Sequence, residues 1–250
     1  MRNDREGARL QLCGTFIVEL NGTRVTSAFP GRQTRVLVSY LVLARPNPVP
    51  RDTLIDVLWG DDPPVSAGGA LSVLVSKVRA AAGAELINGR SQLAISLPEP
   101  TVVDVEVALS SVHTAESAIV TGDWRRAWSS GLGAVFIARR PFLPEATGPW
   151  AESWRRRLAD VQVRALECYA TACLELGGSE LPGAERAARE LLEVAPFRES
   201  GHLLLMRALS ARGNRAEAIA VYERLRILLR EELGVDPDQA MQQAYLRLLN

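Results

Sequence analysis

The hydrophobic pattern of this chain changes period twice within its first hundred residues, and this constrains the fold more than any other feature. Apolar residues first recur at every second position, which is typical of a β-strand, and Asn21-Gly22 then supplies a hairpin turn. From Gln33 the period is that of an α-helix, and after Gly83 it returns to two. The alternating positions are Leu10, Leu12, Phe16, Val18 and Leu20 before the helices, and Leu93, Ile95 and Leu97 after them. We therefore expect helices between two segments of β-structure.

Three short helices are expected between these two segments. Prolines, glycines and one candidate N-cap serine set their limits, which are Gln33 to Ala44, Pro50 to Gly60 and Ser66 to Gly83. A tight loop before the third helix is typical of a helix-turn-helix. A hairpin at about residues 85–97, directly after that helix, is typical of a wing. Residues 1–98 are therefore predicted to be an α+β winged helix-turn-helix domain, and Pro98 and Pro100 indicate the boundary.

The remaining residues, 99–250, are predicted to be an all-α domain. No strand pattern recurs beyond Thr101, and we expect residues 103–250 to contain no strand. Amphipathic helices are expected at 103–120, 123–137, 148–176, 182–194, 198–212, 214–233 and 237–249. Small residues recur at intervals typical of tetratricopeptide helix pairs, and the alanines expected to be buried at close helix crossings are Ala127, Ala187, Ala208 and Ala218. The predicted fold is thus mainly α, a winged helix-turn-helix followed by a tetratricopeptide-like (TPR-like) helical repeat domain.

Composition excludes several classes of protein. Hydrophobic residues make up 47 % and charged residues 23 %, the balance of a folded domain, and no apolar run approaches the ~20 residues of a membrane span. Residues 1–9 are too polar for a signal peptide, so a cytoplasmic protein without membrane contact is expected. Net charge is zero, but residues 1–98 carry eleven basic against eight acidic residues and the rest eighteen against twenty-one. The sign of this asymmetry favours an N-terminal part that contacts nucleic acid.

No constellation of catalytic or metal-binding residues is present in the sequence. The three cysteines form no CxxC pair, and there is no P-loop, no GxGxxG after a strand and no HExxH. His113 and His202 each lie inside an expected helix without a partner that would build a triad. The tryptophans at i, i+4 spacing are explained by core packing. We therefore expect neither an enzyme nor a bound metal or cofactor.

Three segments carry a resemblance to a known family. They are LIDVLWGDDPP (54–64), WAESWRRRLADVQVRALE (150–167) and LLMRALSARGNRAEAIAVYERLRILLREELGVDPDQAM (204–241). Together they resemble the antibiotic regulatory protein (SARP) family of actinobacterial transcription activators, which joins a winged helix to a bacterial transcriptional activator domain. The similarity covers about residues 9–249, and EELGVDP is its most specific part. It implies a homodimer on repeats of double-stranded promoter DNA that recruits RNA polymerase holoenzyme, often at a secondary-metabolite gene cluster.

Phosphate contacts and base contacts require different residues. Arg32 and Gln33 match the family's basic-Gln pair at the start of the first helix, where backbone N–H groups already favour phosphate oxygens. Arg51 has the equivalent place on the second helix, and Arg90 follows the turn of the wing, where arginines commonly enter the minor groove. For each of these arginines, an ordinary solvated side chain is the alternative.

The third helix is expected to face the groove with a surface that is poor in charge. Its apolar stripe, Leu71, Val75 and Val78, leaves the opposite side to Ser72, Val73 and Ser76, flanked by Lys77 and Arg79. Gly68, Gly69 and Ala80 stand where the family has polar or basic residues. DNA binding is therefore expected to be salt-sensitive and modestly selective. A protein-binding adaptor whose winged helix has lost DNA contact is the alternative function.

Overall fold

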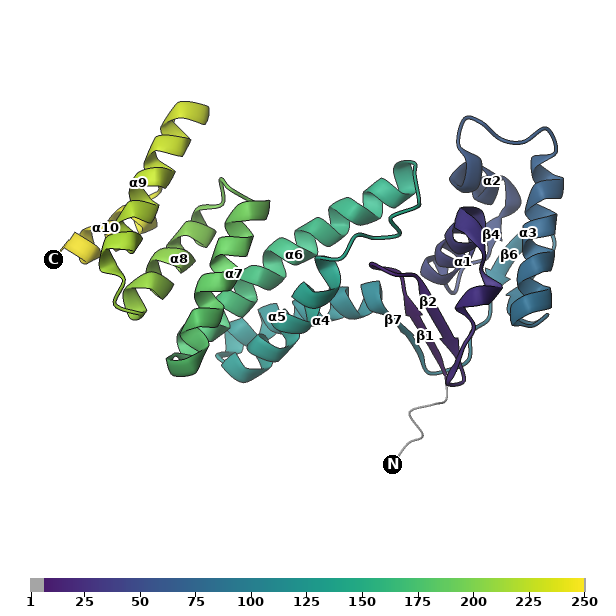
Figure 1. Ribbon diagram of the computed structural model, residues 1–250, viewed down its shortest axis with the longest axis horizontal. Coiled ribbons are helices and arrows are strands. Elements are labelled where there is room, and N and C mark those ends of the chain that lie inside the picture. The colour runs from purple at the N-terminus through teal and green to yellow at the C-terminus, as the bar shows by residue number, and fades with distance from the viewer. Residues whose placement is uncertain (1–6, 250) are drawn as a thin grey trace. The chain divides into compact units, whose positions relative to one another are not determined.

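The N-terminal sheet contains a strand that the sequence pattern did not predict. The computed structural model describes residues 7–249. The strands of this sheet are β1 (Ala8–Gln11), β2 (Ile17–Leu20), β3 (Thr23–Arg24) and β7 (Thr101–Val103). Their order in the sheet is β3-β2-β1-β7 (Figure 1). β1 pairs with β2 in antiparallel register and with β7 in parallel register. The expectation of no strand from residue 103 onward was wrong, because β7 includes Val103. Three residues are too few for their alternation to be visible in the sequence.

The helices and the wing form as the sequence predicts. The elements are η1 (Thr26–Ala28), α1 (Gly31–Ala44), β4 (Val49–Pro50), α2 (Arg51–Trp59), α3 (Ala67–Ala82), β5 (Ile87–Asn88) and β6 (Gln92–Ile95). β6 lies between β4 and β5 in a three-stranded sheet, so the predicted hairpin at 85–97 is confirmed. Gly89 in its turn has φ +96°, and a Cβ there would lie 2.0 Å from the Gln92 carbonyl oxygen. Only glycine fits this turn without strain.

The segment after α5 (Trp124–Ala138) belongs to the same compact unit as the winged helix. The chain divides into one unit of Met1–Val107 with Arg140–Leu158 and a second of Ala108–Arg139 with Ala159–Asn250. The Leu143 N–H donates to the Leu12 carbonyl at 2.9 Å, and the Gly14 N–H donates to the Pro141 carbonyl at 2.8 Å. This division differs from the boundary expected after residue 98, since β7 and residues 140–158 pack on the N-terminal elements.

Asp104, the first residue of α4 (Asp104–Thr121), contacts the backbone that follows β1. Its carboxylate accepts the N–H groups of Leu12 at 2.9 Å and Cys13 at 3.0 Å. Arg140 lies 3.6 Å from the same carboxylate. Burial raises the pKa of Asp104 above its ordinary value, against the opposing effect of these donors. A single side chain therefore caps the loop that follows β1.

The helices of the C-terminal part begin and end within two residues of their expected limits. They are α4 (Asp104–Thr121), α5 (Trp124–Ala138), α6 (Pro149–Leu176), α7 (Leu181–Val194), α8 (Glu199–Ala211), α9 (Arg215–Glu232) and α10 (Gln239–Leu249). A short 3-10 helix, η2 (Gly178–Glu180), was not expected. Neighbouring helices of the second unit pack on one another along the chain (Figure 1). The four alanines expected at close crossings, Ala127, Ala187, Ala208 and Ala218, are all buried. The predicted fold class, a winged helix-turn-helix followed by a helical domain, is confirmed.

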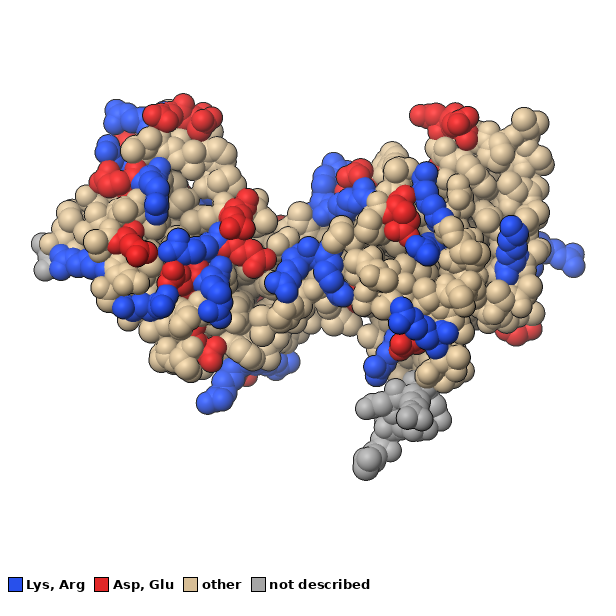
Figure 2. All heavy atoms as spheres, viewed as in Figure 1, with Lys and Arg blue, Asp and Glu red and all other residues tan. Residues whose placement is uncertain are grey.

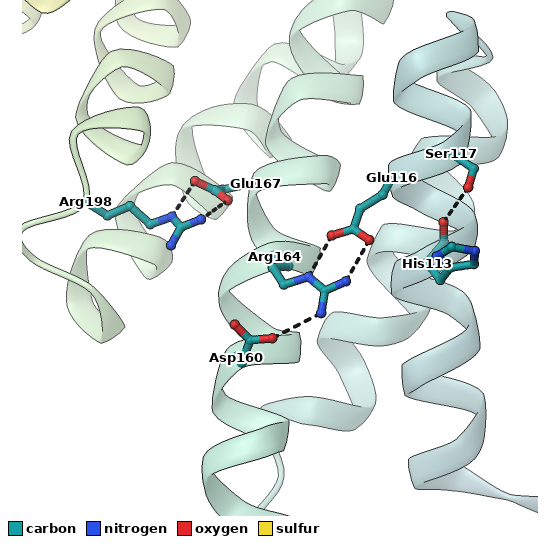
Figure 3. Close-up of polar contacts among 7 residues, drawn as sticks. All are labelled: His113, Glu116, Ser117, Asp160, Arg164, Glu167 and Arg198. Carbon is teal, nitrogen blue, oxygen red and sulfur yellow. Dashed lines mark hydrogen bonds and ion pairs between the residues drawn. The ribbon is translucent and has the colours of Figure 1, made fainter.

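Ion pairs connect the helices of the second unit at its surface (Figure 3). Arg164 on α6 donates to both carboxylate oxygens of Glu116 on α4, each at 2.7 Å, and to Asp160 at 3.1 Å. Arg198, just before α8, donates to Glu167 on α6 at 2.6 and 2.8 Å.

Over residues 7–249, no helix is both long and apolar enough to cross a membrane.

Candidate nucleic-acid interface

The outer face of α3 is open to solvent, as the periodicity predicts. Leu71, Val75 and Val78 are buried, and Figure 1 shows α3 at the edge of the winged-helix unit. The residues exposed on its other side are Gly69, Ser72, Val73, Ser76, Lys77 and Ala80. Val73, with 53 % of its surface exposed, is the large apolar side chain of this face. Figure 2 shows few charged atoms over this part of the unit. The face offers small groups, one apolar side chain and one ammonium group.

Of the two glycines at the start of α3, only Gly69 has a side chain close to where a Cβ would lie. Ser66 stands at the N-cap, as expected, but its hydroxyl makes no cap hydrogen bond. A Cβ at Gly69 would lie 2.7 Å from the Ser66 Oγ, whereas a Cβ at Gly68 would meet nothing within 4 Å. Gly69 therefore accommodates the serine, and Gly68 is left on the open surface.

Arg51 connects α2, the first turn of α3 and the wing. Its Nη2 donates to the Ser72 Oγ at 2.7 Å and to the Gly68 carbonyl at 3.1 Å, and its Nη1 lies 3.5 Å from the Arg90 carbonyl. The Ser72 hydroxyl donates in turn to the Gly68 carbonyl at 2.8 Å. The Ser72 side chain is thus exposed but already engaged within the protein. Arg51 therefore connects α3 to the turn of the wing.

Arg79 braces the wing against α3. Its Nε donates to the Ile87 carbonyl at 2.8 Å, and its Nη2 lies 3.5 Å from the Gly89 carbonyl. The Arg90 side chain is exposed at the turn. These contacts place the guanidinium groups of Arg51 and Arg79 beside the turn of the wing, where Arg90 is exposed.

Arg32 and Gln33 do not join this group. Both are half-buried at the N-terminus of α1. Arg32 Nη2 donates to the Thr147 Oγ1, in the segment that precedes α6, and its buried Nε has no hydrogen-bond partner among the described residues. Residue spacing did not indicate this contact, since the partner of Arg32 lies more than a hundred residues away. Sequence reasoning also missed the carbonyl partners of Arg51 and Arg79, which lie much closer along the chain.

Side chains elsewhere offer little nucleophilic chemistry. Burial is the main cause that raises the pKa of Cys13 to about 12 and those of Cys168 and Cys173 to about 11, so all three thiols stay protonated at neutral pH. The His202 Nε2 donates to the Pro196 carbonyl at 2.9 Å, and burial lowers the pKa of this ring. Among residues 7–249, no three His, Cys, Asp or Glu side chains are grouped to hold a metal ion.

Comparisons with known proteins agree with this architecture. The family model described as "Bacterial transcriptional activator domain" matches residues 103–249. Regulatory protein AfsR of Streptomyces griseus is 31 % identical over 87 % of this chain, and the match covers 22 % of AfsR. Regulatory protein DnrI of Streptomyces peucetius is 28 % identical, over 96 % of this chain and 92 % of DnrI. The chain therefore spans about a fifth of the length of AfsR and nearly all of DnrI.

The fold also matches a solved structure, that of Mycobacterium tuberculosis EmbR in complex with a low affinity phosphopeptide. The TM-score is 0.80 at 23 % identity, over 98 % of this chain and 65 % of that one. Fold and exposed helix together define a winged-helix protein with a helical activator domain. Because the family model covers more than half of its residues, the chain belongs to the SARP family of bacterial transcriptional regulators. The resemblance expected from three sequence segments is confirmed.

Proposed function

We propose that the chain is a DNA-binding transcriptional activator that binds double-stranded promoter DNA with α3 and its wing. The observation that carries this proposal is the exposed outer face of α3, beside which the guanidinium groups of Arg51 and Arg79 contact the turn that carries the exposed Arg90. A helix of this kind fits the major groove, and arginines at its border fit the phosphates on either side. Family membership supports the same function.

The residues have separate roles in this proposal. Arg51, Lys77, Arg79 and Arg90 act on phosphates, and Gln33 adds a phosphate-facing group at the N-terminus of α1. Ser76 and Val73 face the bases, where the methyl groups of valine fit the methyl group of thymine. Ser72 positions Arg51. Arg32 is left out, because it is half-buried and its guanidinium contacts Thr147, which is not part of the wing.

The partners follow from the same proposal. Two copies on neighbouring half-sites compensate for the weak base contacts of each, since binding of one raises the effective concentration of the other. RNA polymerase holoenzyme is the protein partner, at promoters of a secondary-metabolite gene cluster. The protein would act in the cytoplasm without catalysing a reaction.

The test begins with selection of bound fragments from genomic DNA by the whole chain, followed by fluorescence anisotropy on the selected duplex and on a scrambled one. We expect affinity to fall steeply with salt, and Arg51→Ala to weaken binding to both duplexes and to reduce the slope of log K against log salt by about one. Arg24→Ala, an exposed arginine on β3, is the matched control and should leave both duplexes unaffected. Retention of the full salt slope by the Arg51 variant would contradict the proposed role of that residue.

A second candidate is a protein-binding adaptor. It is favoured by the charge-poor face of α3, where Val73 is half exposed and glycines occupy the first turn. If this is the function, the whole chain should show no saturable DNA binding even at about 50 mM salt, where phosphate contacts are strong.

A further inference from the structure

A cavity of about 330 Å³ lies beside the second helix of the helix-turn-helix, within the winged-helix unit. Residues of α2 from Thr53 to Gly60 line one part of the cavity, and Thr147–Trp150 at the start of α6 line another. Arg32 of α1 also lines it. This volume is at the lower end of the range of about 300–1,000 Å³ for small-molecule sites. It is large enough for one or two fused rings with a short substituent.

Arg32 has hydrogen-bonding capacity that the protein does not use. A guanidinium group has five N–H donors. That of Arg32 is half-buried and held in place by Thr147, while its buried Nε has no partner among residues 7–249. A buried donor without a partner is unfavourable. An anionic oxygen in the cavity would accept hydrogen bonds from this guanidinium group, which would also stabilise its negative charge.

Two tryptophans are among the apolar residues that line the cavity. Trp59 ends α2, and Trp150 lies in the first turn of α6. The ring of Trp150 is fixed by its packing on Tyr40, at 5.1 Å between centroids, and on Phe142, at 5.6 Å. Rigid indoles favour a flat aromatic ligand, because ring stacking adds to the burial of apolar area.

The charges of the lining decide between an anionic and a cationic ligand. Asp56 is exposed to water, whereas Arg32 is half-buried and held in place. A cation in the cavity would lie against this fixed guanidinium, and a second negative charge on an anion would be repelled by Asp56. A ligand with a single negative charge is compatible with both residues.

We propose that this cavity binds a small planar aromatic monoanion, whose acidic group pairs with Arg32 and whose ring packs on Trp59 and Trp150. This function is separate from DNA binding and is measured without DNA, so its failure would leave the proposed regulator intact. It also accounts for an arginine at the start of α1 that faces inward rather than towards the wing.

The test is calorimetric titration of the whole chain with 2-naphthoate, with the neutral 2-naphthamide and the cationic 2-naphthylmethylammonium as matched probes. We expect saturable 1:1 binding of 2-naphthoate, at least about tenfold tighter than either of the others, which corresponds to about 1.4 kcal/mol. Saturation should be accompanied by a change in tryptophan fluorescence. No saturable binding of 2-naphthoate, or tighter binding of the cation, would overturn the proposal.

Variants then locate the site. Arg32→Gln should reduce the affinity for 2-naphthoate to that for the amide, while Arg32→Lys should keep the preference for the anion. Thr53→Phe, which fills the cavity and leaves Arg32 in place, should abolish binding of all three probes. Arg24→Gln is the control and should have no effect, and circular dichroism should show each variant folded. Unchanged affinity in either folded Arg32→Gln or folded Thr53→Phe would place the binding elsewhere and refute the assignment.

Discussion

At the scale of single residues, Arg79 and Lys77 allow the structural and electrostatic roles of a basic residue to be separated. Both carry one positive charge on α3, two positions apart. Arg79 donates to the carbonyl of the fully buried Ile87, whereas Lys77 is exposed. We predict that Arg79→Ala lowers the free energy of unfolding by about 1–3 kcal/mol, because a buried carbonyl loses a charged donor.

Lys77→Ala is the matched control and should stay within about 0.5 kcal/mol of the unmodified protein. Urea titration followed by circular dichroism measures both. Identical transition midpoints for the two variants would show that the contacts of Arg79 with the wing do not stabilise the fold.

The ion pair of Glu116 with Arg164 predicts a dependence of stability on pH. The hydrogen bond from Arg164 holds the pKa of Glu116 below its ordinary value. A carboxylate whose pKa is depressed by folding stabilises the protein above the unfolded pKa and loses this effect as pH falls through the folded one. Because both side chains are about one-third exposed, 36 % for Glu116 and 35 % for Arg164, we expect only about 0.2–1 kcal/mol.

Glu116→Gln should therefore lower stability at pH 7, and its difference from the unmodified protein should vanish below about pH 4. Urea midpoints across that range measure it. Glu193→Gln, at an exposed carboxylate of α7, should show no such difference. A pH-independent effect of Glu116→Gln would argue that shape rather than charge matters at this position.

The sequence predicted which face of α3 is open but not what holds the arginines beside it. A buried stripe at helical spacing, such as Leu71, Val75 and Val78, leaves only one side for solvent, so the exposure of Val73 and Ser76 could be deduced. Arg51 and Arg79 bond to backbone carbonyls whose positions depend on tertiary packing. Spacing along the chain contains no information about such partners.

At the scale of elements, α5 and α6 approach each other closely at Gly131. A Cβ on the buried Gly131 would lie 3.1 Å from the backbone nitrogen of Tyr169. We predict that Gly131→Ala lowers the free energy of unfolding by about 1–3 kcal/mol, because the backbone of α6 has to move to relieve the overlap.

Gly133, on the same helix, is the matched control. A Cβ there would meet nothing within 4 Å, so Gly133→Ala should stabilise the protein by up to about 1 kcal/mol through helix propensity. The two variants should thus shift the urea midpoint in opposite directions. Shifts of the same sign would refute the close approach.

Element prediction succeeded where the periodic segment was long. The helices from α4 to α10 could be placed within two residues, since each spans several turns of a repeating pattern. The two-residue β4 and the three-residue β7 were not found. Each is defined by its partner strand, β6 or β1, and not by a pattern of its own.

At the scale of the whole molecule, the winged-helix unit is discontinuous in sequence. It comprises residues up to Val107 and then Arg140–Leu158. The prolines at 98 and 100 predicted a domain boundary, but the unit continues past them to Val107 and also includes residues 140–158. Prolines in the sequence indicate where a chain turns. They do not indicate which later segment packs on an earlier one to complete its core.

This discontinuity determines how the protein could be recombined with its relatives. A chimera that exchanges the winged-helix unit requires three junctions, after Val107, Arg139 and Leu158, instead of a single one after residue 98. The first and third fall inside the helices α4 and α6. Since an α-helix turns about 100° per residue, one extra residue at either junction would misalign the hydrophobic stripe that follows it. We therefore expect exchange among such regulators to keep α4 and α6 at their full length. The winged-helix unit and the second unit would then be inherited together.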